Sequence, residues 1–101
     1  MRFSPELRDA VADGDVTVSI RLWQRPKVKV GGRYQSDGCE IEVDAVEMLP
    51  FSAVTADDVR RSGETDREAL RQRAAHAGPV HDDTLVYRVE FHVLPAGRAA
   101  R

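Results

Sequence analysis

Apolar and polar residues alternate along three segments of the chain, and this alternation is its strongest structural signal. The segments are VTVSIRLW at 16–23, CEIEVDAVE at 39–47 and TLVYRVEFHVL at 84–94. Side chains along a strand point alternately to opposite faces, so a period of two predicts strands with one buried face. The apolar faces would carry Val16, Val18, Ile20 and Leu22, then Ile41, Val43 and Ala45, and then Leu85, Tyr87, Val89, Phe91 and Val93.

Three short helices are predicted from the residues that would open them. The tripeptide SPE places a hydroxyl, a proline and an acid in the order typical of a helix start, and it predicts a helix over 5–12. The tetrapeptides TADD and TDRE each set an acid three residues after a threonine, the spacing of a capping box, and predict helices over 56–62 and 66–76. Few helices and several strands favour an α+β fold with a small, strongly bent sheet or partial barrel.

Length and composition narrow the class of protein. A chain of 101 residues has room for one core, so we expect a helix within 1–12, one domain over 13–94 and a disordered tail over 95–101. No segment approaches the roughly 20 apolar residues of a membrane span, and the first residues lack the apolar run of a signal peptide. The single cysteine, Cys39, indicates a reducing compartment, and we expect a cytoplasmic protein without a membrane partner.

Charge is concentrated in two neighbouring blocks, although the net charge is only −2. Residues 16–36 carry five cationic side chains and no acid, and residues 37–47 carry five acids and no base. The two blocks would pair across neighbouring strands, or the first would form a basic cleft for phosphates. Both interpretations are open at this point.

The basic block also contains two aromatic residues and a pair of glycines at 31–32. Arginine donors suit a phosphate or a base edge, an exposed indole suits stacking on a base, and glycine amides allow close approach. The block therefore predicts an interface for RNA or a nucleotide-like molecule. Its candidate residues are Arg21, Trp23, Lys27, Lys29, Arg33 and Tyr34. Salt bridges to the acids at 40–44, core packing of the indole and a solvated hairpin are the structural alternatives.

Several short segments follow one another along the chain in an order that is informative as a set. They are Gly14 with Arg21, KVGGRY at 29–34, IEVDAV at 41–46, TADDVRRSG at 55–63 and VYRVEF at 86–91. From about residue 13 to residue 94 the chain thereby resembles the ASCH domain, in particular a small bacterial stand-alone member. This family belongs to the PUA-like superfold of small β-barrels, many of which bind RNA. The resemblance implies a PUA-like sheet or barrel that binds RNA or a nucleotide.

The resemblance also implies an alternative activity. Small bacterial members that deacylate N4-acetylcytidine use a lysine and a threonine of a motif G-x-K-x-x-(E/T)-x-R, together with a later glutamate. This sequence has Gly14, Val16, Ser19 and Arg21 at the corresponding positions. An amidohydrolase, or a weak ribonuclease, would use Ser19, Arg21 and Glu68, but valine at the lysine position neither accepts nor donates a proton. Glu68 is equally suited to a capping box.

We expect no metal and no cofactor. Cys39 and the three histidines, at 76, 81 and 92, lack metal-ligand spacing, and no phosphate-binding loop or dinucleotide fingerprint is present. The chain is expected to be a monomer or a homodimer, and a protein-interaction domain that uses exposed strand edges is a third possible class.

Overall fold

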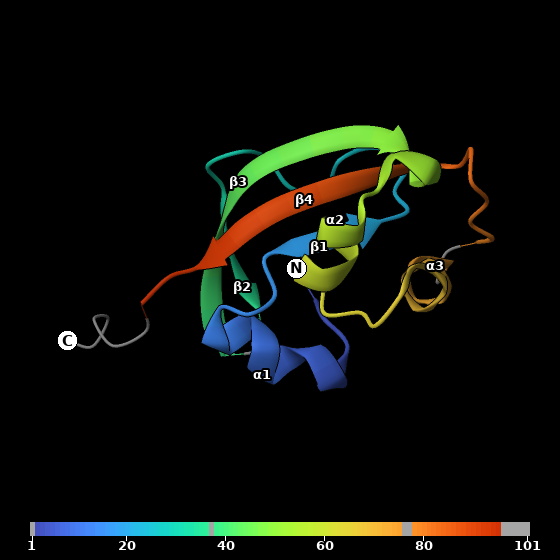
Figure 1. Ribbon diagram of the computed structural model, residues 1–101. Coiled ribbons are helices and arrows are strands. Elements are labelled where there is room, and N and C mark those ends of the chain that lie inside the picture. The colour runs from blue at the N-terminus through green and yellow to red at the C-terminus, as the bar shows by residue number, and fades with distance from the viewer. Residues whose placement is uncertain (1, 37, 76–77, 96–101) are drawn as a thin grey trace.

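Figure 1 shows a computed structural model, which describes residues 2–36, 38–75 and 78–95. This part of the chain forms one antiparallel sheet with helices on both of its faces. The strands are β1 (Val18–Arg21), β2 (Arg33–Ser36), β3 (Cys39–Pro50) and β4 (Leu85–Val93), in the order β1-β4-β3-β2. The helices are α1 (Pro5–Asp13), α2 (Ala56–Arg61) and α3 (Arg67–Ala74), and a 3-10 turn, η1, covers Phe51–Ala53.

The sheet is open, because β1 and β2 form its two edges and do not pair with each other within the described residues. The predicted α+β class and bent sheet are confirmed, whereas a closed β-barrel is wrong. β3 and β4 curve strongly along their length in Figure 1. A bulge between Val43 and Ala45 interrupts their pairing, and such bulges bend and twist a strand.

β1 is shorter than the alternation predicted. The N–H of Thr17 donates to the carbonyl of Arg61 at 2.9 Å, outside the sheet, so the strand begins only at Val18. The last strand also departs from simple alternation, because Val86 is fully buried and Leu85 is exposed. Alternation fails there because one end of β4 is covered on the face opposite to the one predicted.

The helix starts confirm one predicted capping box and correct the other. Thr55 and Asp58 exchange side-chain to backbone hydrogen bonds at 3.0 and 3.2 Å, which is a complete capping box. α3 instead begins after Asp66, whose carboxylate accepts the N-terminal capping bond at 2.8 Å. The box expected between Thr65 and Glu68 is therefore wrong, because the aspartate between them takes the cap position.

Each face of the sheet carries its own apolar cluster. The cluster on the α1 side contains Phe3, Leu7, Val11, Val16, Val28, Ile41, Val43, Val89 and Phe91. The cluster on the α2 and α3 side contains Val18, Ile20, Phe51, Val54, Val59, Leu70, Ala74, Val80 and Val86. β4 supplies side chains to both clusters, because successive residues of a strand point to opposite faces. α1 is thus packed into the same folded unit as the sheet.

A charged network connects α2 to β4 and to Thr17, the residue before β1. Asp58 accepts a hydrogen bond from Arg88 Nε at 2.9 Å, and the two side chains are only 9% and 15% exposed. Arg88 and Arg61 both contact the carboxylate of Glu90, at 3.3 and 2.6 Å. Arg61 also donates to the hydroxyl of Thr17 at 3.0 Å. The network satisfies charges that α2 would otherwise cover without partners.

Replacing Asp58 with Asn is expected to lower the free energy of unfolding by about 2–4 kcal/mol at pH 7, because the largely buried Arg88 loses its nearer carboxylate and keeps the longer contact with Glu90. Burial alone would raise the pKa of Asp58, but hydrogen bonds from Arg88 and from the Thr55 backbone outweigh it and hold this pKa below its ordinary value. The stabilisation is therefore complete above the pKa of an unfolded aspartate and is lost as the pH falls through the lower folded pKa. Denaturant unfolding between neutral and acidic pH measures both effects.

Asp57→Asn is the matched control, since the neighbouring Asp57 pairs with Arg60 on the exposed side of α2. An exposed pair contributes little, so this variant should change the free energy of unfolding by less than about 1 kcal/mol. Equal losses in the two variants at pH 7 would show that the buried network is not stabilising.

Candidate ligand-binding site

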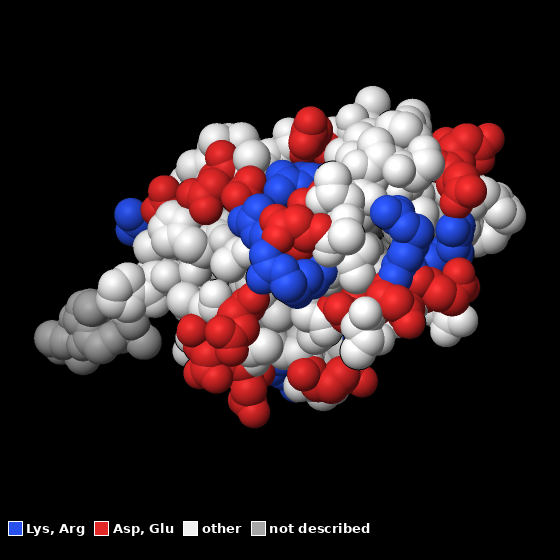
Figure 2. All heavy atoms as spheres, in the orientation of Figure 1, with Lys and Arg blue, Asp and Glu red and all other residues white. Residues whose placement is uncertain are grey.

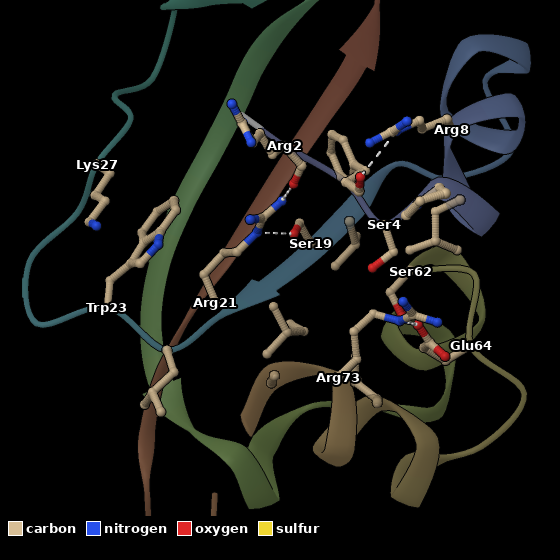
Figure 3. A pocket seen from close by; sticks show the side chains of 18 residues that line it. Arg2, Ser4, Arg8, Ser19, Arg21, Trp23, Lys27, Ser62, Glu64 and Arg73 are labelled. Atoms are coloured by element: carbon tan, nitrogen blue, oxygen red, sulfur yellow. Dashed lines mark hydrogen bonds and ion pairs between the residues drawn. The ribbon is translucent and has the colours of Figure 1, made fainter. Parts of the chain in front are cut away.

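A hollow of about 610 Å³ borders β1, which is an edge strand of the sheet. We call it the β1 pocket, and its floor consists of residues 18–23. The segment at 2–8 forms one wall, and residues of the α2–α3 loop and of α3 form the opposite wall (Figure 3). The volume lies within the range of small-molecule sites.

The floor of the β1 pocket is organised around Arg21, the last residue of β1. Its Nε donates to Ser19 Oγ at 2.6 Å, and its Nη2 donates to the carbonyl of Arg2 at 2.5 Å (Figure 3). The guanidinium carbon lies 5.2 Å from the centre of the Phe3 ring and 5.9 Å from that of Trp23. Burial lowers the pKa of Arg21 from its ordinary value, but a guanidinium stays charged at neutral pH. Arg21 thus holds a partly covered positive charge at the pocket floor.

Cations outnumber acids around the β1 pocket. Among the residues that the structure describes, five cationic side chains and one acidic side chain line it. They are Arg2, Arg8, Arg21, Lys27, Arg73 and the acid Glu64. Glu64 is only 6% exposed at its side chain and forms an ion pair with Arg73, so its charge is already matched. The lining therefore favours an anionic ligand.

Charges are distributed differently over the face that bears α2. Figure 2 shows blue and red side chains interleaved there, and no broad blue area is visible on this face. The network of Asp58, Arg88, Glu90 and Arg61 belongs to this region, and its charges neutralise one another. An anion gains less from this face than from the β1 pocket.

Four of the candidate residues named from the sequence line the β1 pocket. They are Ser19, Arg21, Trp23 and Lys27. Trp23 is also half-buried, with its ring centre 6.0 Å from that of Tyr87, so the indole packs on the sheet and borders the pocket at once. Packing and ligand contact are thus compatible for this residue.

The other three candidates for ligand binding lie outside the β1 pocket. The hydroxyl of Tyr34 accepts a hydrogen bond from the Lys29 N–H at 3.0 Å. The ring of Tyr34 lies so close to Gly32 that a Cβ there would come within 2.5 Å of the hydroxyl. Arg33 pairs with Glu42, opposite it in the β2–β3 register, at 3.2 Å. These residues form the turn and the cross-strand ion pair that were the structural alternatives.

The catalytic candidates are only partly brought together. Ser19 and Arg21 are in contact, but Glu68 lies outside the β1 pocket, where its exposed side chain pairs with Arg71 at 3.3 Å. The acid that does line the pocket is Glu64. Sequence reasoning missed Glu64 and Arg73 because neither belongs to a recognisable motif, and only the packing of α3 brings them to β1.

The remaining expectations concern metals and membranes. Within the described residues, no group of three or more histidine, cysteine, aspartate or glutamate side chains is placed to hold a metal ion. His76 lies outside the described residues, as does the predicted tail beyond Pro95. No helix in the described ranges has the length and apolar character needed to cross a bilayer.

Comparison with known proteins gives similarity in structure only. No family model matches the sequence, and no curated protein matches it. A crystal structure of an ASCH domain from Lactobacillus crispatus aligns with a TM-score of 0.68 and 22% identity, over 87% of this chain and 70% of that one. The protein EF3133 from Enterococcus faecalis, of the family DUF984, aligns with a TM-score of 0.69 and 17% identity, over 88% and 67%.

A third structure, the hypothetical protein PH0355, aligns with a TM-score of 0.69 and 14% identity, over 93% of this chain and 96% of that one. At these identities the comparisons establish the fold. The chain is an α+β protein with a pocket at the edge strand of an open sheet. More particularly, it has the fold of an ASCH domain, and the resemblance seen in the sequence is confirmed at that level.

The position of the motif lysine is an apolar core position in this chain. Val16 is 2% exposed and belongs to the cluster on the α1 side rather than to the lining of the β1 pocket. Its packing is tight, because a Cβ built on Gly63 would lie 2.9 Å from both Val16 and Leu7. A longer, charged side chain has no space at this site.

Val16→Lys is therefore expected to lower the free energy of unfolding by at least about 3 kcal/mol at neutral pH, because it buries an ammonium without a partner. The buried lysine would have a lowered pKa, so the loss should shrink as the pH rises toward about 10.4, the pKa of an unfolded lysine. Denaturant unfolding at neutral and alkaline pH measures this loss in the free energy of unfolding. Val30→Lys, at an exposed apolar position, is the control and should have little effect; similar losses in both variants would contradict the assignment.

Proposed function

We propose that this protein binds a nucleotide, free or as part of an RNA chain, in the β1 pocket. The observation that carries the proposal is Arg21, a charged guanidinium held beside Ser19 and Trp23 on the floor of a hollow whose charged lining residues, among those described, are mostly cationic. Phosphate suits the fork of guanidinium donors, and an indole face suits a base. The ASCH fold supports the same class of ligand through the RNA-binding relatives that the resemblance implies.

Arg21 keeps donors for a ligand although it is partly covered. A guanidinium has five N–H donors, and the hydrogen bonds to Ser19 and Arg2 use two of them. Lys27 borders the pocket beside Trp23, and Arg2 lies next to Arg21 (Figure 3). This end of the pocket is therefore where the phosphate is expected.

Three broader expectations stay predictions beside this proposal. They are the cytoplasmic location, the limits of the domain at about residues 13 and 94, and the state of assembly as a monomer or a homodimer. Light scattering distinguishes the two states of assembly.

Ligand binding is checked with the fluorescence of Trp23, which is the single tryptophan of the chain. Each of the four nucleoside 5′-monophosphates is added in turn, and a saturable change in emission is expected. The dissociation constant should be micromolar or weaker and should rise with salt, because dissolved ions screen the attraction between the cationic side chains of the pocket and the phosphate. A signal that is absent for all four, or an affinity that does not depend on salt, would contradict the proposal.

Two charge reversals in the same loop sharpen this test. Lys27→Glu changes a residue of the β1 pocket and should weaken binding at least about tenfold. Lys29→Glu makes the same change two residues later, outside the pocket, and should alter the affinity by about twofold or less. Equal effects of the two substitutions would place the site elsewhere on the basic segment.

The geometry favours binding over amidohydrolysis or RNA cleavage. A serine nucleophile needs an adjacent base, and Ser19 Oγ instead accepts a hydrogen bond from Arg21, which cannot serve as a base near pH 7. Glu64 is bound to Arg73, and Glu68 lies outside the pocket.

Incubation with N4-acetylcytidine, and separately with mixed RNA, is accordingly expected to give no product. An active deacetylase and an active ribonuclease serve as positive controls. Turnover that is abolished by Ser19→Ala would establish the enzymatic alternative in place of a pure binding function.

A further inference from the structure

The β1 pocket meets its strand at the edge rather than on one face. Six consecutive residues, Val18 to Trp23, line it. A hollow over one face of a strand would contact every second residue, because alternate side chains point to opposite faces. Ser19 and Arg21 line the pocket from one face of β1, and Val18 and Ile20 from the other. The pocket therefore lies where the backbone N–H and C=O groups of the strand point.

The hydrogen bonds of the sheet identify which backbone groups these are. The Phe91 N–H donates to the carbonyl of Thr17 at 3.0 Å, and the β1–β4 register has no shift. Backbone groups along a strand point alternately toward and away from its antiparallel partner. The odd-numbered residues of β1 thus bond to β4, and the N–H and C=O groups of Val18 and Ile20 point toward the free edge.

Nothing in the described part of the chain forms a hydrogen bond with these edge groups of Val18 or Ile20. Ile20 is 6% exposed and Val18 is 1% exposed, so Ile20 is the more accessible of the two. Nearly all buried backbone N–H groups in proteins have a partner, and a buried one without a partner costs about 1–3 kcal/mol. A ligand in the pocket can supply the partner for Ile20.

We propose that the backbone N–H and C=O of Ile20 recognise the base of the bound nucleotide. This inference rests on the proposed function and deepens it. An unpaired strand edge offers a donor and an acceptor side by side, the arrangement by which edge strands bind extended peptides. The hydrogen-bonding edge of a nucleobase offers a complementary acceptor and donor. The ligand class is then a nucleotide whose base keeps this edge unmodified.

The charges of the pocket orient such a ligand. Arg73 and Glu64 pair at the end opposite Lys27 (Figure 3), and Leu70 of α3 adds apolar lining. A neutral base suits this end, next to Ile20. The phosphate is then directed toward Arg21 and Lys27, and Trp23, which lies beside Lys27 in Figure 3, contacts the sugar next to the phosphate.

Nuclear magnetic resonance of the ¹⁵N-labelled full chain tests the contact directly. On addition of uridine 5′-monophosphate, the Ile20 amide should shift downfield, and its exchange with solvent should slow at least about tenfold. The Ser19 amide is the matched control, because it bonds to β4 in the free protein and should change little. Saturation with uridine monophosphate without a change at Ile20 would overturn the inference.

Modified ligands provide a second, independent measurement. 3-Methyluridine 5′-monophosphate lacks the N3–H donor, and we expect it to bind at least about tenfold more weakly than the parent nucleotide. Guanosine monophosphate and its 1-methyl derivative make the same comparison for a purine. Equal affinities within both pairs would refute recognition by the Ile20 backbone and leave nucleotide binding intact. Loss of binding by all these nucleotides would instead refute the proposed function.

Two further ligands complete the design. Ribose 5-phosphate has no base and should bind at least about tenfold more weakly than uridine monophosphate; equal binding would show that the base is not recognised. A uridine tetranucleotide distinguishes a free nucleotide from RNA as the source of the base. The Ile20 amide should respond to whichever of the two binds more tightly, and a bound form that leaves it unchanged counts against the inference.

Discussion

The antiparallel pairing of β4 with both β1 and β3 is the interaction on which the rest of the structure depends. Because β4 is central, its side chains enter the apolar clusters on both faces of the sheet. α1 covers one face, and α2 and α3 cover the other. Within residues 2–36, 38–75 and 78–95, β1 pairs with β4 alone, so its second edge is left between helices that belong to opposite faces. The β1 pocket is a consequence of this open sheet.

The sheet and its helices carry two kinds of charged cluster. Around α2, arginines and acids neutralise one another in a largely buried network that ties the helix to the sheet. Around the β1 pocket, the described part of the chain places five cations and one acid, and that acid is itself paired with Arg73. The first cluster has a structural role, since its charged groups bond to one another. The second has the excess of one sign that attracts a ligand of the opposite sign.

Arg21 connects the fold with the proposed function. Its side chain donates to the carbonyl of Arg2 and packs over Phe3, so it joins the pocket floor to the wall formed by the N-terminal segment. The same guanidinium carries charge at the pocket floor. If the backbone of Ile20 recognises a base, the strand contributes twice, through a side chain for the phosphate and through its edge for the base. The fold shared with ASCH domains would then be specialised here with Val16, a core side chain, at the position where the sequence resemblance implies a lysine.

Local patterns in the sequence were sufficient for most of the secondary structure. Alternation located β1, β3 and β4, because strand periodicity depends only on neighbouring residues. The hydroxyl and acid of Thr55 and Asp58 located α2 for the same reason, whereas Asp66 displaced the cap expected at Thr65 because two adjacent residues compete for one cap position. The open sheet was not distinguished from a barrel, since closure depends on how two distant edges meet.

The residues of the candidate site also divide into those that a local pattern predicts and those that long-range packing brings in. The sequence by itself placed Ser19, Arg21 and Trp23 on one face of a predicted strand, with Lys27 in the loop that follows, because alternation depends only on neighbouring residues. Only the tertiary structure decided that Lys29, Arg33 and Tyr34 belong to a turn and a strand pair, and that Arg2, Glu64 and Arg73 border the pocket instead. Arg2 precedes α1, Glu64 lies in the α2–α3 loop, and Arg73 belongs to α3. Their convergence depends on long-range packing against β1, and no local pattern encodes it.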